Sequence, residues 1–89
     1  MVDSVNSERA FHEAFRRRLK EVRDELGWTQ ADMAEALGVP LENYKKYERR
    51  SKFPPHLFAQ LARVTHRPIE FLLTGRGPNL RIVRNRTAN

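Results

Sequence analysis

The apolar residues near the start of the chain recur at the spacing of a helix. Five of them fall on one stripe, in steps of four, four, three and four: Phe11, Phe15, Leu19, Val22 and Leu26. Ser7 is a candidate N-cap for this helix, and Gly27 is a candidate for its end, with Trp28 folding back over that end. The pattern predicts a first helix over residues 7–26.

Two shorter helices are predicted next. Thr29 offers an N-cap oxygen, and Gly38 ends a segment whose apolar face consists of Met33, Ala34 and Leu37. Pro40 is tolerated in a first helical turn, and Tyr44 and Tyr47 then lie three residues apart on one face. We expect helices over residues 30–37 and 41–49.

The second half of the chain predicts two more helices. A basic connection that ends in Pro54 and Pro55 cannot continue the third helix. The fourth helix is expected over residues 55–65, with these residues inward: Leu57, Phe58, Leu61, Ala62 and Val64. Pro68 opens a fifth helix that Gly75 ends. The apolar side chains of that helix suit a core or a subunit contact.

These elements predict an all-α domain of five helices over residues 7–75. Residues 1–6 are expected to form a flexible N-terminus, and residues 76–89, with Arg81, Arg84 and Arg86, a basic and disordered tail. The expected core consists of Phe15, Leu19, Val22, Met33, Ala34, Leu37, Val39, Tyr44, Tyr47, Leu61 and Leu72.

Composition narrows the class of protein. The chain has no cysteine, which excludes disulfides and zinc fingers with thiolate ligands and favours a reducing, cytoplasmic compartment. No apolar run approaches the roughly 20 residues that span a bilayer, so we expect no membrane contact. The three histidines lack metal-ligand spacing, and no glycine-rich phosphate loop is present, so we expect no enzyme activity, metal or cofactor.

The charge is distributed unevenly along the chain. Residues 1–48 carry ten acids and eight bases, whereas residues 49–89 carry nine bases and the single acid Glu70. The overall charge of +6 is therefore concentrated in the second half. A surface of this kind attracts polyanions such as nucleic acid, although a merely solvated basic surface is the alternative.

The second and third helices carry the motif that indicates function. Gln30 begins one helix, Ala34 allows close approach, Gly38 permits the turn, and Tyr44 and Tyr47 anchor the other helix. Residues 27–39, GWTQADMAEALGV, resemble the Cro/repressor-type (XRE) helix-turn-helix family. The likeness continues through Tyr47-Glu48 and through residues 69–75, IEFLLTG. It covers roughly residues 11–75 and implies a five-helix domain that binds operator DNA as a dimer and regulates transcription.

The resemblance assigns roles to the third helix and its surroundings. It implies base contacts by Leu41, Glu42 and Lys46 in the major groove of double-stranded DNA. The residues expected on the DNA backbone are Gln30, Asn43, Lys45, Arg49, Arg50 and Lys52. Arg23 and Glu48 match an ion pair that orients the third helix. A homodimer is expected to form around the fifth helix, where Phe71 and Leu73 are apolar.

The chain departs from the family at several positions. Arg50 and His66 stand where the family often has glycine, and a left-handed conformation at either would cost about 1 kcal/mol. Pro40 replaces a capping serine or threonine, and Tyr44 is bulkier than the usual aliphatic residue. An antitoxin-like protein that uses the same fold mainly to hold a protein partner remains the alternative function.

Overall fold

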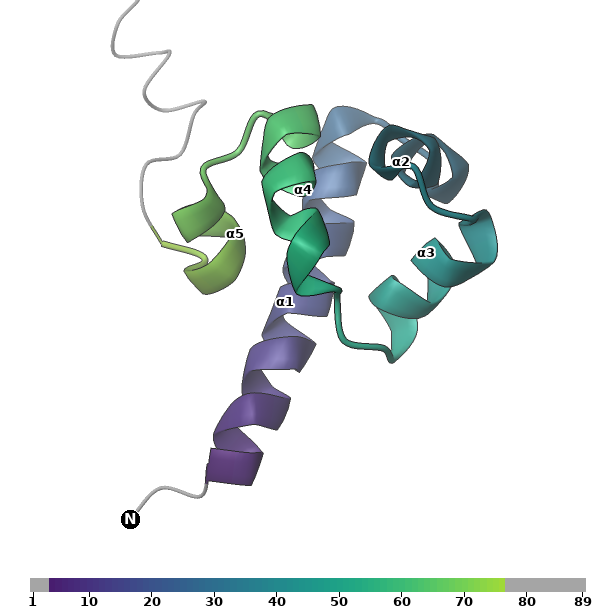
Figure 1. The fold of residues 1–89 in the computed structure, drawn as a ribbon. Helices are drawn as coiled ribbons and strands as arrows, with labels where there is room; N and C mark the ends of the chain where they lie inside the picture. Colours follow the sequence, from purple (N-terminus) through teal and green to yellow (C-terminus); the bar gives the residue numbers. More distant parts are fainter. Residues whose placement is uncertain (1–3, 77–89) are drawn as a thin grey trace, which may run out of the picture.

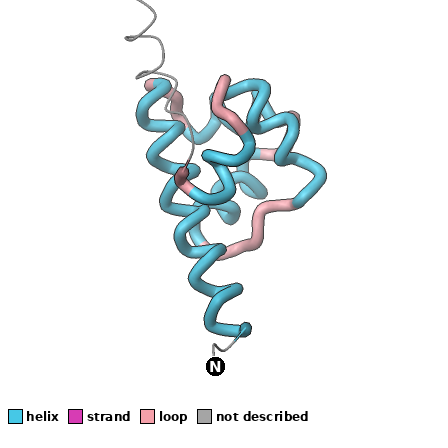
Figure 2. The backbone as a smooth tube through the Cα atoms, turned by 90° about the vertical axis from the view of Figure 1, so that its left-hand side faces the viewer, coloured by secondary structure: helices cyan, strands magenta, loops and turns pink. Residues whose placement is uncertain are grey.

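The computed structural model describes residues 4–76, with side chains from Ser7 onward. These residues form five α-helices and one short 3-10 turn, and no β-strand occurs among them (Figure 2). The predicted all-α fold of five helices is therefore confirmed. The predicted tail lies outside the described residues from position 77 onward.

The longest helix, α1 (Ser4–Leu26), passes behind α4 in Figure 1, and its first turns project beyond the other helices. Phe15, Leu19 and Val22 from its apolar stripe are buried. Phe11, one turn earlier on the same stripe, is 37% exposed and stacks on Phe15 with ring centroids 6.3 Å apart. The predicted start at residue 7 is wrong. The helix begins three residues earlier, so Ser7 lies inside it and is not its N-cap.

The helix α2 (Gln30–Leu37) has the predicted bounds, and its start is fixed by a capping box. The Asp32 backbone N–H donates to Thr29 Oγ1 at 3.0 Å, and the Thr29 backbone N–H donates to the Asp32 carboxylate at 2.8 Å. Two N–H groups that a helix start leaves without partners are thereby satisfied. The predicted cap at Thr29 is confirmed.

The turn between α2 and α3 (Leu41–Arg49) depends on Gly38. Gly38 adopts φ 74°, a left-handed conformation, and the Val39 N–H then donates back to the Ala34 carbonyl at 3.0 Å. Pro40 sits at the N-cap of α3 and provides no side-chain hydrogen bond. The predicted bounds of α3 are confirmed, and α3 packs mainly against α2 and α1.

The basic connection after α3 is anchored by an aromatic residue that the sequence pattern does not identify as core. Phe53 is 4% exposed and lies with its ring centroid 5.3 Å from Phe15 and 5.2 Å from Phe58. The chain then forms the 3-10 turn η1 (Pro55–Leu57) and the helix α4 (Phe58–Thr65). A single predicted fourth helix from residue 55 is therefore wrong in its first turn, which is tighter than an α-helix.

The core agrees with the expected set apart from two residues at its edge. Val39 and Tyr47 are only half-buried and pack against the core from its rim. Leu57, expected inward on the fourth helix, is buried, and Phe53 and Thr65 are buried in addition to the expected residues. The Thr65 hydroxyl donates to the Leu61 carbonyl at 2.7 Å, which satisfies the one fully buried polar side chain of α4.

The last helix, α5 (Ile69–Thr74), packs against α1 and α4 and buries Leu72. Arg18 of α1 donates from Nη1 to the Leu72 carbonyl at 2.9 Å. Gly75 ends α5 with φ 74°, a left-handed conformation that favours glycine. The hydrogen bond from Arg18 to Leu72 joins the end of α5 to α1.

Of the two positions where the family often has glycine, only one is left-handed. Arg50 adopts φ −154°, whereas His66 ends α4 with φ 57° and ψ 39°. We expect His66→Gly to raise the free energy of unfolding by about 0.5–1 kcal/mol, because the strain at positive φ exceeds the extra flexibility of glycine when unfolded. The midpoint of thermal unfolding should rise by a few degrees. His66→Ala keeps the Cβ and is the control. Equal midpoints for the two variants would contradict the explanation.

Candidate nucleic-acid interface

The outer face of α3 is polar and uncovered. Glu42, Lys46 and Arg49 follow at steps of four and three residues and form one exposed stripe, opposite the buried Tyr44. The helix lies at one edge of the molecule (Figure 1). Since Arg49 belongs to the last turn of α3, it continues the stripe of Lys46 and is not only part of the connection that follows.

The remaining predicted DNA contacts on α3 lie around this stripe. Leu41 is 36% exposed at the start of α3, Asn43 is exposed and Lys45 is half-buried. Lys45 Nζ lies 3.6 Å from a Glu42 carboxylate oxygen, a solvent-exposed pair that contributes little to stability. The Lys46 ammonium has no hydrogen-bond or ion-pair partner among residues 7–76, so it is available to a ligand.

The inner side of α3 is held by a buried polar cluster around Glu48. The carboxylate of Glu48 accepts two hydrogen bonds from Arg23, at 2.6 and 3.2 Å, and one from Gln30 Nε2 at 3.1 Å. The hydroxyl of Tyr44 donates to the same carboxylate. Arg23 also donates from Nη1 to the Trp28 carbonyl at 2.8 Å. We call Arg23, Gln30, Tyr44 and Glu48 the Glu48 cluster.

The Glu48 cluster joins three helices. Arg23 comes from α1, Gln30 from α2, and the other two members from α3. The side chains of Arg23 and Glu48 are only 11% and 5% exposed, so water competes little for their bidentate pair. A two-point contact of planar groups fixes an angle as well as a distance. The cluster therefore sets how α3 is presented on the surface.

Protonation of Glu48 is linked to the stability of the fold. Burial alone raises the pKa of Glu48, but hydrogen bonds from Arg23, Tyr44 and Gln30 outweigh it and bring the pKa below its usual value near 4.5. Burial, together with the hydrogen bond to Glu48, raises the pKa of the Tyr44 hydroxyl, which therefore stays protonated and donates at neutral pH.

A pH dependence follows from this lowered pKa. The stabilisation by Glu48 is complete above pH 4.5 and is lost as the pH falls through the lower value of the folded state. We expect the stability difference between the wild type and Glu48→Gln to be constant from pH 7 to 5 and to shrink below pH 4.5. Urea unfolding at several pH values measures it. A difference that persists unchanged to pH 3 would contradict the linkage.

The side chain of Gln30, predicted to contact a DNA phosphate, is already engaged within the protein. Gln30 is half-buried at the first position of α2, and its amide nitrogen already donates to Glu48. The Asp32 carboxylate lies in the same first turn, bonded to the Thr29 N–H, and places a negative charge at the helix start. Gln30 therefore contributes to the orientation of α3 in the DNA-free protein.

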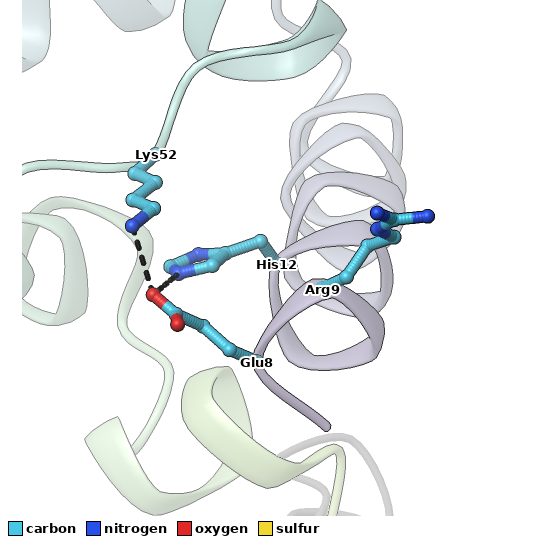
Figure 3. A pocket seen from close by; sticks show the side chains of 4 residues that line it. All are labelled: Glu8, Arg9, His12 and Lys52. Atoms are coloured by element: carbon cyan, nitrogen blue, oxygen red, sulfur yellow. Dashed lines mark hydrogen bonds and ion pairs between the residues drawn. The ribbon is translucent and has the colours of Figure 1, made fainter. Parts of the chain in front are cut away.

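The basic connection after α3 is held against the first half of α1. Arg16 Nη1 lies 3.5 Å from the Arg50 carbonyl, and Lys52 Nζ donates to Glu8 Oε2 at 2.8 Å (Figure 3). Together with the buried ring of Phe53, these contacts keep the connection against α1 and leave the Arg50 and Lys52 side chains exposed.

The structure brings together the predicted pair of Arg23 and Glu48 and collects most of the predicted DNA residues around the exposed side of α3 and the connection. Sequence reasoning missed the hydroxyl of Tyr44, the amide of Gln30 and the carboxylate of Glu8 as members of these contacts. Tyr44 carried a signal, since a hydroxyl on a buried residue needs a partner. Apart from its charge, Glu8 had no feature in the sequence that indicated a contact with Lys52.

Little in the described part of the chain suggests other chemistry. Among residues 7–76 no group of His, Asp or Glu side chains is placed to hold a metal ion. The surface hollow beside Lys52 has a volume of about 260 Å³ and is lined by Glu8, Arg9, His12 and Lys52 (Figure 3). None of the helices described is long and apolar enough to cross a membrane.

The geometry defines a helix-turn-helix DNA-binding protein: two short helices, a tight glycine turn, and a second helix that presents an uncovered polar face. A helix-turn-helix family model matches residues 19–72, which is more than half of the chain. The chain therefore belongs to this family, the Cro/repressor-type family that its sequence resembles, whose domain binds DNA. No curated protein and no solved structure matches the chain significantly.

Proposed function

We propose that the protein is a sequence-specific, cytoplasmic regulator of transcription, repressor-like in action, that inserts α3 into the major groove of double-stranded DNA. The observation that carries this proposal is the combination of an uncovered polar face on α3 with a buried cluster that fixes its angle. A side chain distinguishes bases only if its helix is held in one orientation, so the Glu48 cluster supports sequence recognition.

Three residues of α3 are proposed to contact base edges. Lys46 is a donor suited to guanine O6 and N7, and Glu42 is an acceptor suited to the cytosine amino group. Leu41 offers an apolar contact to a thymine methyl group. Of the three, Lys46 is the strongest candidate, since it lies in the middle of the exposed stripe and has no partner among residues 7–76.

The proposed backbone contacts surround these base contacts. The residues are Asn43, Lys45, Arg49, Arg50 and Lys52, with Gln30 at the start of α2. For Gln30 a phosphate contact by its amide requires exchange with Glu48, to which the amide donates in the free protein. Contacts of this kind neutralise phosphates regardless of sequence and make affinity dependent on salt.

The protein is also proposed to bind DNA as a homodimer through the surface around α5. Ile69 is 43% exposed there, and the neighbouring Phe71 and Leu73 are only half-buried. Two recognition helices of a dimer would enter successive major grooves about 34 Å apart. We expect a two-half-site footprint and a stoichiometry of two chains per site, measured by sedimentation with labelled DNA. A single half-site with one chain at saturation would contradict the dimer.

The function is tested by selection of bound DNA from a random pool at physiological salt. We expect one motif to be enriched and to bind at least a thousandfold more tightly than random DNA, as specific DNA-binding proteins do. Binding that is weak and equal for all sequences would overturn the proposal and favour the antitoxin-like alternative, in which the fold mainly holds a protein partner.

A further inference from the structure

The ion pair between Glu8 and Lys52 places an acidic group beside the basic connection that follows α3. Lys52 Nζ lies 2.8 Å from Glu8 Oε2, and the two side chains are 67% and 56% exposed, so the pair faces solvent (Figure 3). His12 lies one turn along α1, with Nε2 3.8 Å from the same carboxylate oxygen. Glu8 lies outside residues 19–72, the part of the chain that the family model matches.

The backbone next to Lys52 is fixed, which limits how far the lysine can move from Glu8. Phe53, the next residue, is buried against Phe15 and Phe58, and Arg16 contacts the Arg50 carbonyl two residues earlier. The Lys52 ammonium therefore stays within reach of Glu8 while its side chain remains accessible. The hydrogen bond and the charge of Lys52 lower the pKa of Glu8, so the carboxylate is ionised at neutral pH.

We propose that Glu8 competes with DNA phosphates for Lys52 and thereby lowers the affinity of the protein for DNA of any sequence. This inference rests on the proposed function, in which Lys52 binds the DNA backbone. A phosphate that approaches Lys52 meets an ammonium group that is already paired, and the Glu8 carboxylate released by the exchange repels it. The DNA interface thus extends to the first half of α1, where Glu8 tunes the affinity.

The competition has a definite effect on salt dependence. When Lys52 binds a phosphate, the DNA releases about one cation, but the freed Glu8 carboxylate attracts a cation in return. Removal of the carboxylate charge removes this compensation. The slope of log affinity against log salt should then become steeper by up to about one, while the preference between DNA sequences is unchanged.

The test compares Glu8→Gln with Glu13→Gln in the full chain, on the selected site and on random DNA at several salt concentrations. Both substitutions remove one negative charge from α1, but Glu13 has no ion-pair partner among residues 7–76. We expect Glu8→Gln to raise affinity about threefold to fivefold on both DNAs, as expected for an exposed pair, and Glu13→Gln to raise it less than twofold. In a Lys52→Ala background the effect of Glu8→Gln should fall to that of Glu13→Gln, because only the general effect of one negative charge then remains.

Equal effects of the two glutamine substitutions would overturn the inference, because the gain would then reflect net charge alone. A loss of affinity in Glu8→Gln would also overturn it, since Glu8 would then prepare Lys52 for the phosphate. A persistent gain in the Lys52→Ala background would assign the effect to another cation. If the wild type fails to bind DNA, the proposed function itself is wrong, an outcome distinct from these three.

Discussion

Replacement of Glu48 by alanine is expected to lower the free energy of unfolding by about 3–5 kcal/mol. The substitution removes the acceptor of four hydrogen bonds and leaves the Arg23 guanidinium, 11% exposed, with only the exposed Asp24 carboxylate at 3.7 Å as an anion. The hydroxyl of Tyr44 loses its partner in a buried environment as well. Because small domains are stable by only about 5–15 kcal/mol, a loss of this size leaves the variant with a small fraction of its stability or partly unfolded. Urea unfolding followed by circular dichroism measures the loss.

Glu42→Ala is the matched control, because it removes the same side chain from the same helix. Glu42 is 78% exposed and makes only the 3.6 Å pair with Lys45, so its loss should change stability by no more than about 0.5 kcal/mol. The double variant Arg23→Met with Glu48→Leu should recover part of the loss, because it leaves no unpaired buried charge. If Glu48→Ala costs no more than Glu42→Ala, the cluster is not what holds α3.

The bounds of α2 and α3 could be predicted from the sequence because their ends are decided by local chemistry. Thr29 and Asp32 satisfy each other's backbone groups, and Gly38 supplies the left-handed residue that the turn needs. Such signals act over three or four residues and are visible in the sequence. The start of α1 has no comparable signal. Its first turn contains no acidic residue, and the helix continues three residues beyond the expected cap.

The contacts that assemble the interface could be predicted only where a family resemblance supplied them. The pair of Arg23 and Glu48 joins residues 25 apart in the chain, and the pair of Glu8 and Lys52 joins residues 44 apart. Periodicity indicates which face of a helix is buried, but not which charged side chains meet across helices. The burial of Phe53 escaped prediction for a related reason: it stands alone in a basic segment, with no helical repeat to mark it.

The Glu48 cluster limits the orientations that α3 can adopt. A guanidinium and a carboxylate with two more donors have few alternative arrangements with all hydrogen bonds made. The tyrosine hydroxyl at position 44 adds one donor that an aliphatic side chain there would lack. Tyr44 therefore helps to fix the orientation of α3 relative to α1 and α2. The direction in which the exposed stripe from Glu42 faces depends on that orientation.

Base recognition and charge attraction are expected to respond differently to the loss of a basic side chain. Lys46→Ala should lose about 1–3 kcal/mol of discrimination at one base position of the selected site, because an edge contact is lost only where the base matters. Lys52→Ala should weaken binding to all sequences alike, because a phosphate contact releases counterions whatever the base, and should reduce the salt slope by up to about one, less the compensation by the freed Glu8 carboxylate. Arg49→Ala is also expected to weaken binding to all sequences alike and to reduce the salt slope by about one, although Arg49 follows Lys46 by one turn on α3.

The three variants are to be titrated on the selected site, on single-base mismatches and on random DNA at several salt concentrations. Both lysine substitutions remove one positive charge from exposed side chains, so net charge is matched and only position differs. A loss of discrimination confined to Lys46→Ala would place this residue on a base edge, because removal of an equal charge from the connection leaves sequence preference intact. Equal losses for all three variants on every DNA would mean that α3 attracts the backbone without distinguishing its bases, and the sequence-specific function would have to be abandoned.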